Sequence, residues 1–286
     1  MVNLIALALG QINFTVSLVE PRDTFYVRED VCIWITLENT TDKKLPVDDL
    51  GAYFGEDPSP WRLIILDEKG DTVERVVYCE ILDLRKSSRD TLMPRGKVKL
   101  CKHLASFTGG NYAIWDHAGQ WLTVKKIILK TRDGYYYEGD VDLGFYAKPM
   151  EPEVEELYKR ALAGPRELPP EERIKLLKQA AEQFLIKYPT HPCAKHLVGT
   201  LAHEPFAAGG RGDMIYTPHI LELEERVILN FPHYFIATSF KPFGSYREKV
   251  PEFYDQLLAK LRLKAQDDPY LMELMKEKKL LKEDQK

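Results

Sequence analysis

Two histidines and a carboxylate stand near one another in the second half of the chain: His196, His203 and Glu204. Imidazole nitrogens and carboxylate oxygens are common Zn²⁺ ligands, so these residues form a candidate metal site. Histidines that share a metal on one helix usually lie four residues apart, whereas a seven-residue step spans about 10.5 Å along a helix. We therefore expect them to be polar residues on a helix surface, and we predict neither a metal nor a cofactor.

A second pairing, Asp116-His117, has the residue types of general acid–base chemistry. A catalytic triad also needs an activated nucleophile, and the chain has no Gly-x-Ser-x-Gly motif. Asp116 to Gln120 therefore indicates a hairpin turn around Gly119.

The glycine-rich run that ends in Arg211-Gly212-Asp213 lacks the Lys-Ser/Thr of a phosphate-binding loop, so we interpret it as a loop between helices. A hydrolase with an unrecognised site is the second alternative to the function that we expect below.

Aromatic side chains supply a candidate binding surface. Tyr135, Tyr136 and Tyr137 are consecutive, so a strand must turn at least one of them outward. Together with Trp121 they could contact a protein or a sugar, because such rings join apolar area to a polar tip. The competing interpretation is packing between domains near the linker.

Cys79 and Cys101 are the most suggestive pair among the four cysteines. If 72–80 and 96–103 form a hairpin about Arg89-Asp90, the two thiols face each other and can be bridged. Two half-buried free thiols are the alternative, because the redox compartment is unknown.

Length and composition limit the functional classes. The chain has 286 residues and a net charge of −4, so we expect two domains and no nucleic-acid partner. It has no apolar run of membrane-spanning length. Residues 4–9 are apolar, but Arg22 is the first basic residue, so they are either a truncated signal peptide or an edge strand. We expect export to the periplasm or the extracellular space, with a cytoplasmic location as the alternative.

The first domain, 1–148, has the pattern of a β-protein. Its short runs are rich in Val, Ile, Thr, Tyr and Trp, are separated by turn residues, and predict strands at 12–19, 31–38, 61–67, 72–80, 96–103, 111–117 and 120–131. The clearest alternation places Val31, Ile33, Ile35 and Leu37 on one face. Strands in this number with no helix between them favour an antiparallel β-sandwich.

Two segments of the first domain resemble a known class of β-sandwich. The strand and turn at 31–46, and the segment Gly109-Gly110-Asn111-Tyr112-Ala113-Ile114-Trp115, resemble immunoglobulin-like domains of bacterial exported proteins. The resemblance implies an immunoglobulin-like β-sandwich with Tyr112 at a tyrosine corner. Ile114 stands where antibody domains carry a cysteine, so the resemblance extends only to the broad sandwich class.

The second domain, 149–286, has helical periodicity. We predict helices at 151–163, 170–188, 192–203, 218–230, 250–264 and 269–283. The segment 170–188 has the strongest pattern, with its apolar face made by Ile174, Leu177, Ala181, Phe184 and Leu185.

The second domain contains a weak internal repeat. Residues 182–189 align with 225–232 at an offset of 43 residues, and Ala194 aligns with Ala237. Phe184, Tyr188, Pro189, Pro192 and Ala194 resemble a tetratricopeptide-like unit of exported bacterial scaffold proteins, although the consensus unit has 34 residues. The chain therefore resembles a two-domain protein, an antiparallel immunoglobulin-like sandwich followed by an all-α helical-hairpin domain. We expect a non-enzymatic interaction or scaffold protein with a protein or peptide partner; the alternative is a carbohydrate- or cell-envelope-binding accessory protein.

Overall fold

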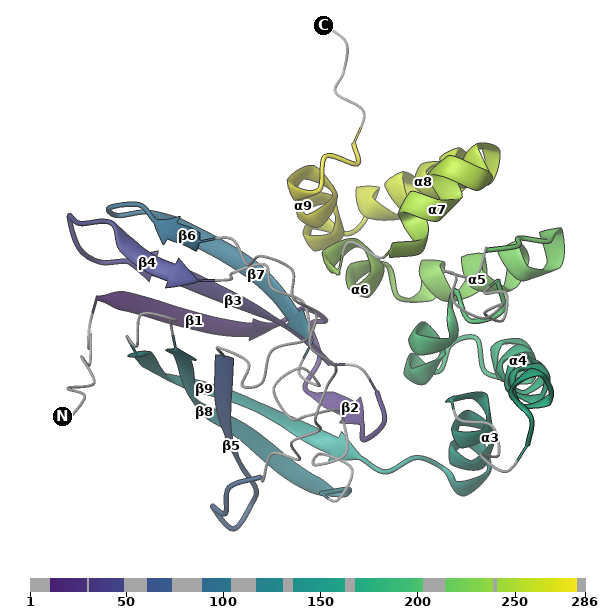
Figure 1. Cartoon of the computed structure of the whole chain (residues 1–286), viewed down its shortest axis with the longest axis horizontal. Helices are drawn as coiled ribbons and strands as arrows, with labels where there is room; N and C mark the ends of the chain where they lie inside the picture. Colours follow the sequence, from purple (N-terminus) through teal and green to yellow (C-terminus); the bar gives the residue numbers. More distant parts are fainter. Residues whose placement is uncertain are drawn as a thin grey trace, which may run out of the picture. The chain divides into compact units, whose positions relative to one another are not determined.

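The computed structural model of the chain describes residues 11–29, 31–48, 61–73, 89–103, 117–130, 136–162, 168–202, 214–238 and 241–281. Contacts within the chain divide it into two compact units, Met1–Pro149 and Met150–Lys286. The first unit is built of strands and the second of helices (Figure 1). The expected order of β-structure followed by α-structure is confirmed.

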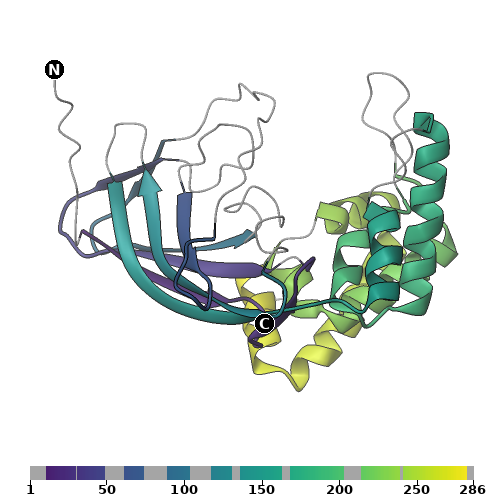
Figure 2. The ribbon, with the colours of Figure 1, turned by 90° about the horizontal axis from the view of Figure 1, so that it is seen from below.

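Two main sheets form the first unit. One is antiparallel with the order β1-β3-β7, made by Ile12–Leu18, Cys32–Asn39 and Lys97–His103. The other has the order β2-β9-β8-β5, made by Thr24–Tyr26, Tyr136–Lys148, Gln120–Lys130 and Trp61–Leu66. A further pair joins β4 (Leu45–Asp48) to β6 (Arg89–Leu92). In Figure 2, β8 and β9 run side by side as long, curved strands.

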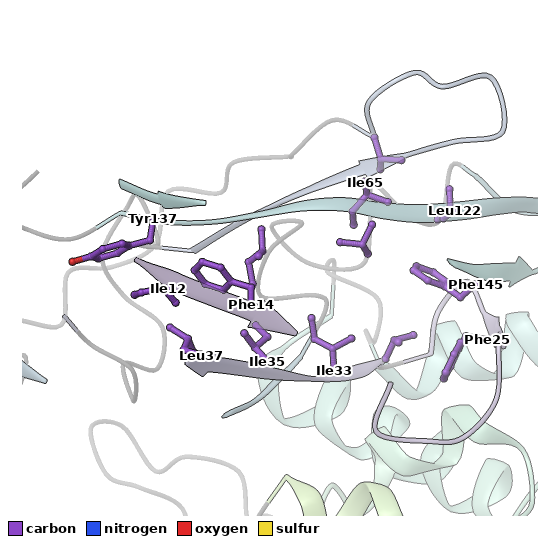
Figure 3. Packing of buried hydrophobic residues seen from close by; sticks show 14 of the residues in the cluster. Ile12, Phe14, Phe25, Ile33, Ile35, Leu37, Ile65, Leu122, Tyr137 and Phe145 are labelled. Atoms are coloured by element: carbon purple, nitrogen blue, oxygen red, sulfur yellow. The ribbon is translucent and has the colours of Figure 1, made fainter. Parts of the chain in front are cut away.

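One apolar core lies between the two main sheets. The predicted inward face of β3 is confirmed, because Val31, Ile33, Ile35 and Leu37 are all buried in it. Figure 3 shows side chains of β1 and β3 directed toward those of the other sheet. The alternation of the strands therefore places a hydrophobic face of each sheet in contact with the other.

Several β-predictions need correction. The long strand β9 was not predicted as a separate run, and β2 pairs with it in parallel, although a wholly antiparallel arrangement was expected. The predicted hairpin about Arg89-Asp90 is wrong because both residues belong to β6, which pairs with β4. The expected strand at 72–80 shows one bridge, Leu66 to Thr72, across a tight turn, and its residues 74–80 lie outside the described part.

The second unit is built of helices that follow one another along the chain. They are α3 (Pro152–Leu162), α4 (Pro170–Lys187), the 3₁₀ helix η1 (Pro192–Leu197), α5 (Pro218–Asn230), α6 (Pro232–Ala237), α7 (Lys241–Lys249), α8 (Pro251–Gln266) and α9 (Pro269–Glu277). Figure 2 shows α3, α4 and α5 beside one another.

The internal repeat at the 43-residue offset corresponds to a repeated backbone geometry at the ends of α4 and α5. Tyr188 after α4 has φ −130° and ψ 50°, and Phe231 after α5 has φ −128° and ψ 52°. The Tyr188 N–H donates to the Phe184 carbonyl at 2.7 Å, and the Phe231 N–H donates to the equivalent Val227 carbonyl at 3.1 Å. A proline follows each aromatic residue and disfavours a helical conformation for it, so both helices end at the same point.

Two helix predictions are wrong in extent. The helix expected at 192–203 stops as η1 at Leu197, because Val198 is extended and Gly199 takes a φ of +87°. The helix expected at 269–283 ends at Glu277, where Lys279 adopts a left-handed φ of 55° and the Leu280 N–H donates to the Met275 carbonyl. Glycine usually occupies this capping position, so a lysine there does not signal the end of a helix. Helices α6 and α7 were not predicted.

Candidate functional site

Helix α4 lies between two surface grooves, and its sequence explains its position. Pro170 begins the helix in a conformation that suits the first turn, and Pro189 ends it. Ala181, Phe184 and Leu185 are buried, whereas Ile174 and Leu177 of the predicted apolar face are half-buried. One face of α4 thus anchors the helix, and its flanks remain available at the surface.

The α4–α5 groove has an apolar floor and a charged rim. Its volume is about 510 Å³, and its floor is formed by Ile174, Leu201 and Ile220. The rim is polar, with lysines, glutamates and a histidine from both helices: Glu171, Lys175, Lys178, Gln179, Glu182, Thr217 and His219. Across the groove, the His219 Nε2 lies 2.7 Å from the Glu182 Oε1.

The α3–α4 groove, on another flank of α4, is of similar volume, about 480 Å³. Ile186, which lines it, is 54% exposed. Two of its four charged side chains are paired with each other: the Lys187 Nζ lies 3.9 Å from the Glu153 carboxylate, which also accepts a hydrogen bond from the Tyr188 hydroxyl at 3.0 Å. The α3–α4 groove therefore offers fewer unsatisfied charges to a ligand than the α4–α5 groove.

A buried carboxylate, Glu224 of α5, lies within the helical unit. It is 0% exposed; it accepts a hydrogen bond from the Gly199 N–H at 2.7 Å and another from the Tyr246 hydroxyl of α7. Burial raises the pKa of Glu224 to about 7, against the opposing effect of the two donors. Burial and the neighbouring carboxylate likewise raise the pKa of Tyr246. These bonds join three segments, so Glu224 acts as a structural link.

The histidine candidates do not come together as a described site. His196 lies on η1, where its Nδ1 makes a hydrogen bond with the hydroxyl of the buried Tyr158. His203 and Glu204 lie outside the described residues, as do Asp116 and the Arg211-Gly212-Asp213 triplet. Among the residues that the structure describes, no three His, Cys, Asp or Glu side chains cluster as metal ligands.

The aromatic candidates separate. Tyr137 is 2% exposed and belongs to the core, so it cannot serve as an outward contact. Tyr136 begins β9, but its side chain lies outside the described part, and so does Tyr135. Trp121 is 41% exposed, and its indole packs against Gly144, where an added Cβ would approach ring atoms to 2.6 Å.

The cysteine and turn predictions have mixed outcomes. Cys101 is half-buried on β7 in register with Trp34, but Cys79 and the corner residue Tyr112 lie outside the described residues. Gly119 has a φ of +85° in the turn before β8, as the turn prediction required. His117, in the same turn, approaches the Gln120 side chain at 3.3 Å.

Sequence reasoning missed the groove residues and Glu224. Lys175, Lys178 and His219 read as ordinary solvent-facing residues, because only the packing of α4 against α5 brings them together. Glu224 had one available signal: at the 43-residue offset it aligns with the buried Ala181. A carboxylate at a position that is otherwise small and apolar needs buried partners.

No protein-family model and no curated protein matches the chain. In the described part of the chain, none of the helices combines the length and apolar composition needed to cross a bilayer. The grooves and the sheet surface are therefore the candidate functional sites.

Proposed function

We propose that the chain is a non-enzymatic interaction protein whose helical unit binds a peptide segment of a partner protein in the α4–α5 groove. The observation that carries this proposal is the groove itself, an apolar floor of Ile174, Leu201 and Ile220 beneath a charged rim. A volume of about 510 Å³ is within the range of ligand-binding clefts. Helical grooves of this kind take apolar anchor residues, while rim charges provide specificity.

A displayed library of random peptides, selected on the full-length protein, tests the groove. The variant Ile174→Glu places a charge on the groove floor, and Ile186→Glu makes the same chemical change on the same helix in the α3–α4 groove. We expect selected peptides to lose at least tenfold in affinity for Ile174→Glu and to keep their affinity for Ile186→Glu. Equal binding to Ile174→Glu and the unmodified protein overturns the proposal.

A second candidate function, binding of a carbohydrate, is favoured by one observation on the sheet unit. The Trp121 indole is backed by Gly144, and 41% of the residue is exposed. A fixed, flat aromatic face of this kind suits contact with the apolar side of a sugar ring. We expect a polysaccharide pull-down to retain the protein and to lose it with Trp121→Ala but not with Trp121→Phe. Equal retention of both variants contradicts a role for the ring.

We also propose the finer classification expected from the sequence: an immunoglobulin-like sandwich, a tetratricopeptide-like helical unit, and export from a bacterial cell. The two facing sheets and the repeated aromatic-proline junction support the two structural parts. Export rests on the sequence alone, and fractionation of the source cells tests it. Recovery of the protein only from the cytoplasm would refute it.

A further inference from the structure

We infer that Glu224 regulates the α4–α5 groove: its protonated side chain holds the groove floor in the binding conformation, and loss of the proton weakens partner binding. This inference rests on the proposed function and adds its regulation by pH. It starts from a fully buried carboxyl group that is hydrogen-bonded to the segment carrying one residue of the floor. Burial disfavours the charged form of a carboxyl group, so proton binding and the surrounding structure are coupled.

Glu224 is bonded to the segment that supplies Leu201 to the groove floor. Its carboxyl group accepts a hydrogen bond from the Gly199 N–H at 2.7 Å, two residues before Leu201. Gly199 has a φ of +87°, where the chain leaves η1 after the extended Val198. A glycine adopts this conformation without strain, and the bond to Glu224 holds it in place. The position of the buried Leu201 side chain therefore depends on this bond.

A second connection joins Glu224 to the start of α5, on the opposite side of the groove from α4. The Tyr246 hydroxyl donates to Glu224, and the Tyr246 ring packs edge to face with Tyr216, with 5.2 Å between the ring centroids. Tyr216 directly precedes Thr217, which caps α5 and lines the groove. A shift of the buried carboxyl group would therefore reach two parts of the groove lining.

Glu224 is the member of this cluster that changes its charge near neutral pH. Burial raises its pKa to about 7, against the effect of its two donors. Burial also raises the pKa values of Tyr246 and Tyr216 above the ordinary value of 10, so both hydroxyls stay neutral.

Ionisation of Glu224 favours an opened segment 199–202, in which water reaches the carboxylate. The closed segment retains the proton up to about pH 7, whereas a hydrated carboxyl group would release it near the ordinary value of 4.5. Because the opened segment does not supply the floor, affinity for a partner should fall as the pH rises from 5 toward 7 and should level off above it.

The affinity of a library-selected peptide, measured from pH 5 to pH 8, tests this inference. The peptide is acetylated and contains no histidine or cysteine, so its own charge changes little above pH 5. We expect the affinity for the unmodified protein to fall roughly threefold or more beyond any fall for Glu224→Gln, which cannot ionise.

Two features of the comparison isolate Glu224 from other groups. Histidines also change charge in this pH range, but His219 of the rim is present in both proteins, so its effect cancels. Glu222→Gln, an exposed position on the same helix, should keep the pH profile of the unmodified protein.

Tyr246→Phe gives a directional test. It removes the hydroxyl that donates to Glu224 and keeps the ring, so the pKa of the carboxyl group should rise further. The pH at which the affinity levels off should therefore move upward, whereas a purely structural role of Glu224 would leave it unchanged.

The outcomes separate the inference from the proposed function. If peptides that depend on Ile174 show the same pH profile with Glu224→Gln and with the unmodified protein, the regulation is overturned and the groove remains the binding site. Peptides that ignore Ile174→Glu overturn both statements. Without peptide, hydrogen exchange of 199–202 at pH 8 should be faster in the unmodified protein than in Glu224→Gln, and equal rates overturn the opening. Circular dichroism of each variant across the pH range establishes that lost binding does not reflect lost folding.

Discussion

Glu224 is the residue whose protonation should most affect the stability of the helical unit. Its pKa is about 7 in the folded protein, against 4.5 as the ordinary value, so folding favours its protonated form. Its contribution is therefore fully present below about pH 4.5 and is lost as the pH rises toward 7. The loss should amount to at most roughly 3 kcal/mol.

The change Glu224→Gln tests this pH dependence. A glutamine keeps an acceptor for the Gly199 N–H and cannot ionise, so the variant should gain stability over the unmodified protein as the pH rises from 5 to 8. Urea unfolding followed by circular dichroism at 222 nm measures the difference. Glu222→Gln, an exposed position on the same helix, is the control. Parallel pH profiles for Glu224→Gln and the unmodified protein would rule out a raised pKa.

Asn39 has a comparable structural role in the sheet unit. It is 0% exposed, its side-chain amide donates to the carbonyls of Lys43, Leu92 and Met93, and its oxygen accepts from the Thr41 N–H. Asn39→Ala leaves buried backbone groups without these partners and should lower the free energy of unfolding by about 2 to 3 kcal/mol. Asn13→Ala, at an exposed position of β1, should cost under about 0.5 kcal/mol.

Tryptophan fluorescence measures the effect of these asparagine changes, because all four tryptophans lie before residue 150. A loss of equal size in the two variants would contradict the assigned role of Asn39.

At the scale of elements, the repeated junctions after α4 and α5 should carry stability. The Tyr188 ring lies 5.4 Å from that of Phe184, and the Lys195 Nζ lies 5.4 Å from the centre of the Phe231 ring. Tyr188→Ala and Phe231→Ala should each cost about 2 kcal/mol, less than a fully buried aromatic because both are half-buried. Ile186→Ala, at an exposed position, should cost little. Unchanged melting temperatures in both junction variants would refute the repeat.

The elements also show what the sequence could predict. Helix α5 and the inward face of β3 were predicted closely, because local periodicity and the flanking prolines or turn residues specify them. The end of η1 depends on the extended Val198 and on the hydrogen bond from the Gly199 N–H to the Glu224 carboxylate. These two partners are far apart in the sequence. Likewise, β6 pairs with β4 across more than forty residues, and no local pattern indicates that partner. Groove residues were missed for the same reason.

For the whole molecule, the two compact units should unfold as separate transitions. Tryptophan fluorescence follows the sheet unit, and circular dichroism at 222 nm follows mainly the helices. Asn39→Ala should move only the fluorescence transition, and Glu224→Gln only the helical one. If either change shifts both transitions equally, the units unfold as one cooperative body.

The central claim is that the α4–α5 groove is where the protein binds its partner. Hydrogen–deuterium exchange of the full-length protein, with and without a peptide selected on it, tests this most directly. We expect the peptide to slow exchange in 170–182 and 217–224, the segments of α4 and α5 that form the groove, and to leave the β8–β9 strands unchanged. Protection confined to the strands, with α4 and α5 unaffected, would contradict the account.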